Sequence, residues 1–170
     1  MALKTRAEYL ASLKKLRPNI YKFGERIEDV TTHPATRRVV ESHARAYDAS
    51  QDPSLAGLFT TASTLTEEKI HRHNSLMTSM EEVIANSKFK REMYRLTGTC
   101  TGALCAGWNG MNTMYAVTHE MDAALGTDYH PRVKKYALQA QAEGWTIAGA
   151  LTDAKGDRSL KASQQPDPDS

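Results

Sequence analysis

The stretch Gly126-Thr127-Asp128-Tyr129-His130-Pro131 separates two helical patterns and indicates the fold class. Before it, apolar side chains recur at the spacing of one helix face, at Met114, Val117, Met121 and Leu125. After it, Pro131 suits the first turn of a second helix, which we expect to end near Gly144 because glycine commonly follows the last helical residue. The sequence therefore predicts a mainly α-helical chain.

The first third of the chain has two more local signals. Thr5 and Glu8 have the spacing of a capping box, and the apolar residues after them recur at helical intervals until Pro18. Residues 19–30 alternate apolar and polar side chains around a glycine, which favours a small β-hairpin or an extended arm. We therefore expect a short first helix followed by this arm.

Three further helices are predicted in the middle of the chain. The first starts near Pro34 and ends near residues 52–53, and a second runs from about Thr66 to Met77. A third is capped by Ser79 and Glu82 and continues through Tyr94 and Arg95. The first of these helices should present one apolar face, formed by Val39, Val40, His43, Ala44 and Tyr47.

Composition and charge narrow the class of protein. The formal net charge of +2 arises from dispersed basic and acidic residues, which gives no electrostatic footprint for nucleic acid. No apolar run is long enough to span a bilayer, and the first residues lack the apolar core of a secretion signal. We therefore expect a cytoplasmic domain that binds neither nucleic acid nor membrane, with reduced cysteines.

The segment from Gly98 to Gly110 is uncharged and rich in small residues. Such a segment allows another backbone, a cofactor or a substrate to approach closely. The alternative is a buried helix packed tightly against its neighbours. The sequence alone leaves both interpretations open.

Residues 145–151 have the length and composition of a β-strand. They suggest a boundary between an N-terminal helical domain, residues 1–144, and a lead-in strand and loop of a β-domain, residues 145–170. Partner strands for this segment are missing from the chain, although a strand needs them to satisfy its hydrogen bonds. We therefore expect a partner polypeptide that supplies them.

Two patterns have spacings that occur in metal sites. Glu68 and His71 have the spacing used in carboxylate-bridged di-metal bundles, but a second copy of the motif is missing, so a solvated helix face is the favoured interpretation. Cys100 and Cys105 are five residues apart, which places them on different sides of a regular helix. They provide at most half of a ligand set, and buried apolar cysteines are the alternative.

Six stretches resemble the family of flavoproteins that contains 4-hydroxyphenylacetate 3-hydroxylase and 4-hydroxybutyryl-CoA dehydratase. They are Tyr9-Leu10-x-Ser12-Leu13, Phe23-Gly24-Glu25-Arg26-Ile27, His33-Pro34, Tyr47-Asp48, Gly126-Thr127-x-Tyr129-His130 and Gly149-Ala150-Leu151-Thr152-Asp153-x-Lys155-Gly156-Asp157-Arg158. They span nearly the whole chain, and the last is the most specific. The resemblance implies an acyl-CoA-dehydrogenase-like fold with an N-terminal helical domain, a middle β-domain and a C-terminal helical bundle.

The resemblance also implies FAD as the cofactor. The last stretch is similar to the turn that opens the flavin site of acyl-CoA dehydrogenases, where a threonine contacts the polar edge of the ring. Ala154 replaces the proline of that turn. Thr152 is the main expected flavin contact, and the other expected cofactor-binding residues are Asp153, Lys155, Asp157 and Arg158.

The two chemistries of the family differ in the small-residue segment. Dehydratases bind a [4Fe–4S] cluster with two cysteines there, and the resemblance places Cys105 at the second position and Thr101, beside Cys100, at the first. Hydroxylases instead hold a phenol with an arginine and a tyrosine, whose positions correspond to Ala103 and Gly107. The residues implied to lie near the substrate are Arg95, Ala103, Gly107 and Trp108.

Cys100 stands beside the first ligand position and not at it. We therefore rank a reduced-flavin monooxygenase slightly ahead, because this enzyme needs no cluster. The first alternative is a dehydratase-like lyase that uses FAD and a [4Fe–4S] cluster on an acyl-CoA, with Cys100 and Cys105 as ligands. The second is a non-catalytic helical subunit. In each case we expect a homo- or hetero-oligomer with a second polypeptide that carries the β-domain and the C-terminal bundle, and no catalysis by this chain alone.

Overall fold

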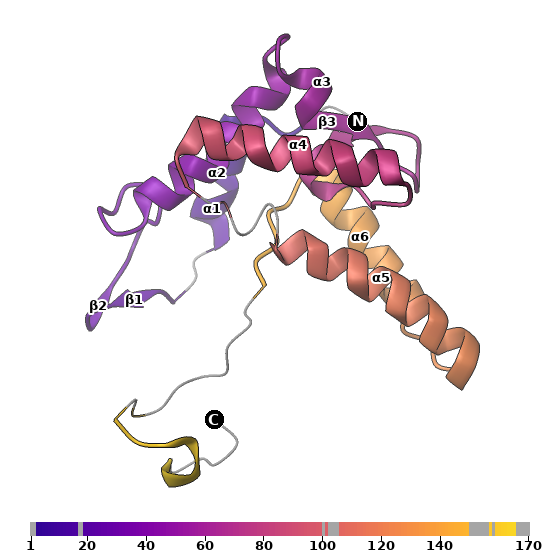
Figure 1. Ribbon diagram of the computed structural model, residues 1–170. Helices are drawn as coiled ribbons and strands as arrows, with labels where there is room; N and C mark the ends of the chain where they lie inside the picture. The colour runs from indigo at the N-terminus through magenta and orange to yellow at the C-terminus, as the bar shows by residue number, and fades with distance from the viewer. Residues whose placement is uncertain are drawn as a thin grey trace.

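The computed structural model describes residues 3–16, 19–99, 101, 106–149, 157 and 159–165. Its larger helices are α1 (Arg6–Leu16), α2 (Arg37–Gln51), α4 (Met80–Thr97), α5 (Ala106–Leu125) and α6 (His130–Glu143). Shorter elements are β1 (Tyr21–Lys22), β2 (Glu25–Arg26), α3 (Ala56–Phe59), β3 (Thr60–Ala62), β4 (Lys69–His71), and the 3₁₀ helices η1 (Arg72–Asn74) and η3 (Ala162–Gln164). The predicted mainly helical class is confirmed (Figure 1).

Local signals in the sequence place the starts of two helices correctly. The Thr5 backbone N–H donates to Glu8 Oε2 at 2.7 Å, and the Glu8 N–H donates back to Thr5 Oγ1 at 3.3 Å, so the capping box forms before α1. Ser79 caps α4 by accepting the N–H of Glu82. Two hairpins flank α2, and the first of them, β1–β2, is the predicted arm.

The predicted helix over residues 66–77 is wrong. Residues of β4 pair with β3 in antiparallel register, with Thr60 opposite His71 and Ala62 opposite Lys69, and η1 follows directly. The pairing holds because the Arg72 side chain donates to the carbonyls of Leu58 and Thr60, at 2.7 and 2.9 Å. The apolar residues in this stretch therefore lie in a partly buried hairpin and not on one face of a helix.

Two smaller expectations also need correction. Helix α2 begins at Arg37, so Pro34 lies in the turn before it and not in its first turn. Val39, expected on the buried face, is exposed, whereas Val40, His43, Ala44 and Tyr47 are buried as predicted.

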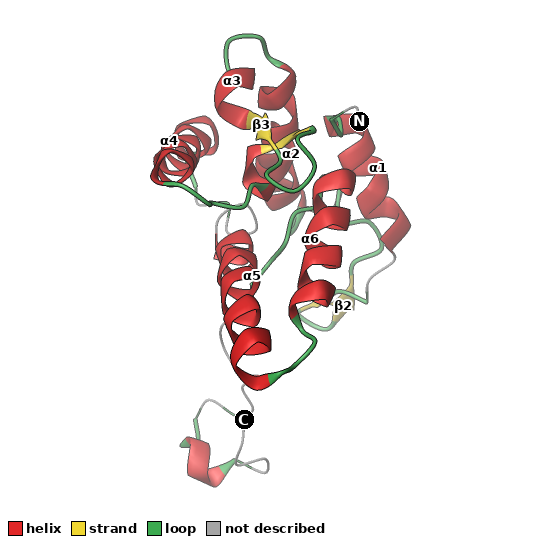
Figure 2. Cartoon of the chain, turned by 90° about the vertical axis from the view of Figure 1, so that its right-hand side faces the viewer, coloured by secondary structure: helices red, strands yellow, loops and turns green. Residues whose placement is uncertain are grey.

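Within the described part of the chain, the core consists of three apolar clusters. One lies between α1 and α2 around Tyr9 and Tyr47, and the second joins α2, α3 and α4 around Phe59 and Phe89. The third lies between α5 and α6 around Trp108. Helices α5 and α6 run side by side in opposite directions and extend from the rest of the body (Figure 2).

Residues 145–149 form no strand, so the predicted strand 145–151 is wrong over the part that the structure describes. The backbone there bonds to other parts of the body: the Trp145 N–H donates to Ala140 O at 3.0 Å, and the Trp145 carbonyl accepts from Asn74 Nδ2 at 2.9 Å. Residues 150 and 151 lie outside the described part. No helix among the described residues is long and apolar enough to cross a bilayer.

Candidate functional site

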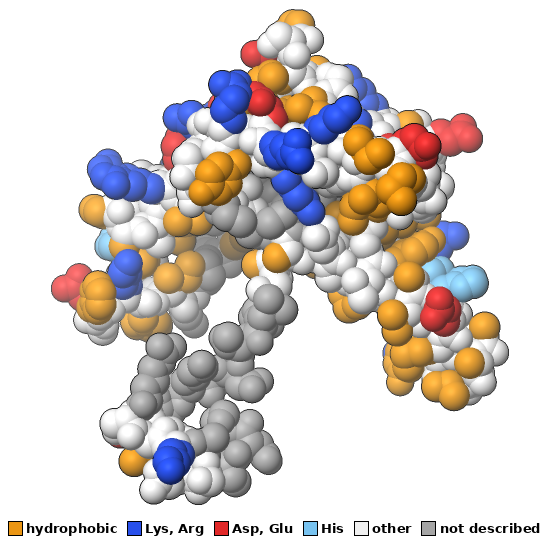
Figure 3. Space-filling model, in the orientation of Figure 1, with side chains coloured by type: hydrophobic (Ala, Val, Ile, Leu, Met, Phe, Trp, Pro, Cys, Tyr) orange, Lys and Arg blue, Asp and Glu red, His pale blue; other side chains and the backbone are white. Residues whose placement is uncertain are grey.

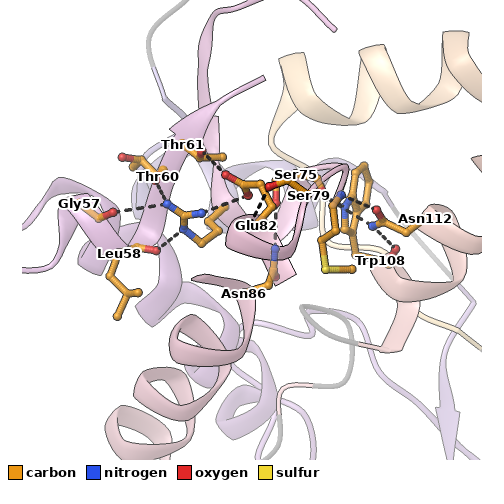
Figure 4. A network of polar contacts seen from close by, with 12 residues as sticks. Gly57, Leu58, Thr60, Thr61, Ser75, Ser79, Glu82, Asn86, Trp108 and Asn112 are labelled. Atoms are coloured by element: carbon orange, nitrogen blue, oxygen red, sulfur yellow. Dashed lines mark hydrogen bonds and ion pairs between the residues drawn. The ribbon is translucent and has the colours of Figure 1, made fainter. Parts of the chain in front are cut away.

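The start of α5, the stretch after η1 and residues 145–149 meet at one junction. Trp108 is buried there, and its indole N–H donates to the carbonyl of Ser75 at 2.6 Å. A buried indole N–H needs such an acceptor, because an unpaired polar group in the core is costly. This bond fixes the first turn of α5 against the stretch after η1 (Figure 4).

Asn112, one turn further along α5, strengthens the same attachment. Its Oδ1 accepts the backbone N–H of Met77 at 2.8 Å, while its Nδ2 donates to the Trp108 carbonyl at 3.1 Å. Asn86 of α4 donates to Ser75 Oγ at 2.9 Å. Side chains of two helices thus hold residues 75–77, which lie outside helices and strands.

A second set of buried amides positions residues 145–149. Gln141 of α6 donates to the Asn74 carbonyl at 2.9 Å and accepts from Ser63 Oγ at 2.7 Å. Asn74 in turn donates to the Trp145 carbonyl. Each of these amides is buried, so each bond replaces one that water would otherwise make.

Arg72 ties this junction to the hairpin and to α4. Its guanidinium is almost completely buried and donates to the backbone carbonyls of Gly57, Leu58 and Thr60. It also donates to Glu82 Oε2 at 3.2 Å. A buried cation is tolerated when its donors are paired in this way. Figure 4 shows the carbonyl partners and Glu82 around it.

Gly107 makes the tightest contact at the junction. A Cβ added at Gly107 would overlap the carbonyl group of Ile147, and one added at Gly149 would lie 3.6 Å from the Gly107 Cα. At Gly107 the segment permits the close approach of another backbone. Gly107 is also a buried residue of a helix, so the contact agrees with both sequence interpretations. Gly107 follows Cys105 by two residues, and Gly149 precedes Thr152 by three.

The described structure reaches only some of the predicted site residues. Gly107 and Trp108 lie at the junction. Arg95 lies on α4 and pairs with Glu92, largely exposed to solvent. Asp157 lies in the C-terminal segment with η3, where bonds from Ser159 hold the pKa of its carboxyl below the usual value. The predicted residues outside the described part are Cys100, Ala103, Cys105, Thr152, Asp153, Lys155 and Arg158.

Among the described residues, no group of three or more histidine, cysteine, aspartate or glutamate side chains is close enough together to hold a metal ion. His71 instead lies in the core, with its ring 4.9 Å from Tyr47 and 5.3 Å from His73. Burial lowers the pKa of His71 to about 4 and that of His73 well below its usual value. Both imidazoles are therefore neutral core groups near pH 7.

Asn74, Ser75, Asn86 and Gln141 were missed from the sequence. Their polar side chains occur singly among other polar residues, and only the folded chain shows that they are buried and bonded to distant backbone.

A family model described as 4-hydroxyphenylacetate 3-hydroxylase N terminal matches residues 5–170. The chain belongs to this family. It is 36% identical to 4-hydroxybutyryl-CoA dehydratase/vinylacetyl-CoA-Delta-isomerase of Clostridium aminobutyricum, over 98% of this chain and 34% of that protein. It is 30% identical to the 4-hydroxyphenylacetate 3-monooxygenase oxygenase component of Thermus thermophilus, over 97% of this chain and 33% of that protein.

Solved structures of both kinds share the hydroxylase-family fold. An oxygen-tolerant 4-hydroxybutyryl-CoA dehydratase from N. maritimus matches with a TM-score of 0.86 at 33% identity, over 99% of this chain and 33% of that one. An oxygenase component of 4-hydroxyphenylacetate 3-monooxygenase in complex with FAD and 4-hydroxyphenylacetate matches with a TM-score of 0.67 at 24% identity, over 97% and 33%. The chain thus spans about a third of the length of these relatives.

Proposed function

We propose that this chain is the helical N-terminal domain of an FAD-dependent enzyme with an acyl-CoA-dehydrogenase-like architecture. The contact of Gly107 with residues 147–149 carries the proposal. It joins Gly107, one of the expected substrate-side residues, to the segment just before the expected flavin residues, in which Gly149 lies 42 residues later in the sequence. In this proposal, Thr152 contacts the flavin ring, which supplies the redox chemistry when bound.

Hydroxylation by a reduced-flavin monooxygenase is the better supported reaction, because Thr101 does not fit as a ligand of a [4Fe–4S] cluster. Thr101 is buried and stands where the resemblance places the first cysteine ligand. Iron–sulfur clusters are held by thiolates, and a threonine hydroxyl does not replace one. The reaction is therefore inferred from this site and not from the fold, which relatives with different reactions share.

The second candidate is a dehydratase-like lyase, favoured by the higher identity and the closer structural match to dehydratases along the whole chain. In a dehydratase-like lyase, Cys100 would have to supply the thiolate ligand that Thr101 cannot provide. Because Thr101 itself does not fit the cluster, the described residues support no chemical step through one.

One of the two side chains with which phenol hydroxylases hold their substrate has no space in this chain. The resemblance places a tyrosine at Gly107, where the Ile147 carbonyl fills the space of a side chain. We therefore propose a substrate that is held mainly by other residues, in the two thirds of the relatives' length that this chain does not match. We call those two thirds the completing region.

The test uses the assembled enzyme, meaning this chain together with the completing region, purified without oxygen. We expect about one FAD per chain, no stoichiometric iron, and oxygen consumption when reduced FAD is supplied. About four irons per chain, lost in Cys105→Ser with FAD retained, would establish the dehydratase alternative. An assembly that contains no flavin would support the non-catalytic alternative.

A further inference from the structure

Helix α5 is more apolar than is usual for a helix that is exposed along most of its length. Of its twenty residues, all of which the structure describes, only Glu120 and Asp122 carry a formal charge at neutral pH. Its buried residues are Gly107, Trp108 and Met111, all within the first two turns. A helix of this composition is normally covered along its length, yet the last fourteen residues of α5 have no fully buried member.

The side of α5 that faces α6 is already occupied. The Tyr115 ring packs against the His130 ring at 4.5 Å between ring centroids. Asp122 accepts the backbone N–H groups of Tyr129 and His130, at 2.9 and 2.7 Å, and so holds the start of α6. These contacts hold the helix pair together, and the exposed apolar residues of α5 take no part in them.

These remaining residues form a regular seam. Met114, Val117, Met121 and Ala124 follow one another at spacings of three, four and three, with Leu125 beside the last. Met114, Val117 and Leu125 are exposed, and Met121 is half-buried. Alternating spacings of three and four place side chains along one stripe that packs against another helix. Figure 3 shows apolar side chains gathered over the end of this helix pair.

A groove continues the seam onto α6. It has a volume of about 370 Å³ and is lined mainly by apolar side chains: Met111, Met114, Arg132, Val133, Tyr136 and Ile147. Ile147 belongs to the segment that contacts Gly107, so the groove borders the proposed functional junction. An apolar groove between two antiparallel helices can accommodate a third helix by ridges-into-grooves packing.

We propose that the seam of α5 and this groove seat an amphipathic helix of the completing region, an inference that rests on the proposed function. The relatives of known structure are about three times as long as the match, so most of their fold lies outside this chain. The groove borders residues 147–149, which lead toward the expected flavin residues. A partner helix seated there would stabilise the junction as well as cover the seam.

Hydroxyl-radical footprinting of three methionines tests this proposal without any substitution. Met111 is 2% exposed, Met114 is 48% exposed, and Met80 on α4 is 68% exposed. The oxidation rates of all three are compared between the 170-residue chain alone and the assembled enzyme, with bound FAD measured in the same samples. We expect Met114 to be oxidised several-fold more slowly in the assembly, Met80 to remain reactive, and Met111 to be protected in both.

Equal oxidation of Met114 in both samples would overturn the proposal, and if FAD is bound in that assembly the proposed function survives. Protection of Met114 in an assembly without FAD would support the seat and contradict the proposed function. Protection that appears in the chain alone only at high concentration, and not in the assembly, would assign the seam to a second copy and overturn the proposal.

A pair of variants provides an independent check in the assembled enzyme. Val117 and Val83 are each 45% exposed, on α5 and α4 respectively. A glutamate in a helix seam buries a charge on assembly, so Val117→Glu should lower the melting temperature of the assembly while changing that of the chain alone little. Val83→Glu is the matched control and should leave both unchanged. Equal effects of the two substitutions on the assembly would contradict the seat.

Discussion

Gly107 contacts the carbonyl of Ile147 so closely that no side chain fits between them. This contact spans forty residues of sequence and fixes where residues 145–149 lie against α5. The buried Asn74 amide also holds this segment by donating to the Trp145 carbonyl, and Gln141 in turn donates to the Asn74 carbonyl. The position of the segment that leads to the expected flavin residues is thus determined by the helical body.

Arg72→Lys should destabilise the chain by about 2 to 4 kcal/mol. A lysine cannot replace the planar guanidinium that reaches the carbonyls of Leu58 and Thr60 together with Glu82, so it leaves buried acceptors unpaired. The matched control is Arg95→Lys, since Arg95 pairs with Glu92 on the surface, and its effect should stay within about 0.5 kcal/mol. Urea unfolding followed by circular dichroism measures both. Equal losses would show that the buried network is not important for stability.

Phe23→Asn should stabilise the chain by about 1 kcal/mol. Phe23 has a φ of 52° in the turn between β1 and β2, a left-handed conformation that asparagine adopts more easily than phenylalanine. Its ring is 95% exposed, so little packing is lost. Tyr21→Asn removes another exposed ring from the same hairpin and should not stabilise, because β1 is extended there. A Phe23→Asn variant that melts below the native chain would contradict the strain argument.

Acidification should destabilise the chain from about pH 6.5 downward. Burial lowers the pKa of His71 from 6.5 to about 4, so in this range the unfolded chain binds more protons than the folded one. The free energy of unfolding therefore decreases as the pH falls, with His71 alone accounting for about 2 kcal/mol by about pH 5. His73 adds to the effect, since its pKa is lowered in the same direction.

Thermal unfolding at about pH 7.5 and about pH 5 measures this dependence. His71→Phe keeps an aromatic ring against Tyr47. It should make the loss of stability between the two pH values smaller, whatever its effect on stability near neutral pH. His119→Gln, at an exposed position of α5, should leave the dependence unchanged. An unchanged dependence in His71→Phe would show that other groups cause the acid sensitivity.

The parts of the fold that depend on neighbouring residues could be predicted from the sequence. The capping residues Thr5 and Ser79 and the glycine after α6 act within one helical turn, so their patterns are visible locally. The β3–β4 hairpin was missed because its register depends on bonds from Arg72 to carbonyls more than ten residues away.

Residues 145–149 show the same limit at the candidate site. Their composition suits a strand, but bonds from Asn74 and the close approach of Gly107 hold them in an irregular conformation. Long-range contacts of this kind override local propensity. The family resemblance supplied the expected flavin residues, and only the structure showed that the segment before them packs on α5.

A comparison of Gly107→Ala with Gly110→Ala in the assembled enzyme tests whether the contact at Gly107 positions the flavin site. An added Cβ at Gly107 would displace the Ile147 carbonyl, whereas one at Gly110 would meet nothing within 4 Å. Helix propensity favours alanine at both positions, by up to about 1 kcal/mol in a helix interior, so the contact is the difference that should lower flavin binding. Bound FAD per chain is the measurement. We predict that Gly107→Ala loses most of the flavin while Gly110→Ala retains it, and full flavin content in Gly107→Ala would contradict the claim that this contact positions the flavin site.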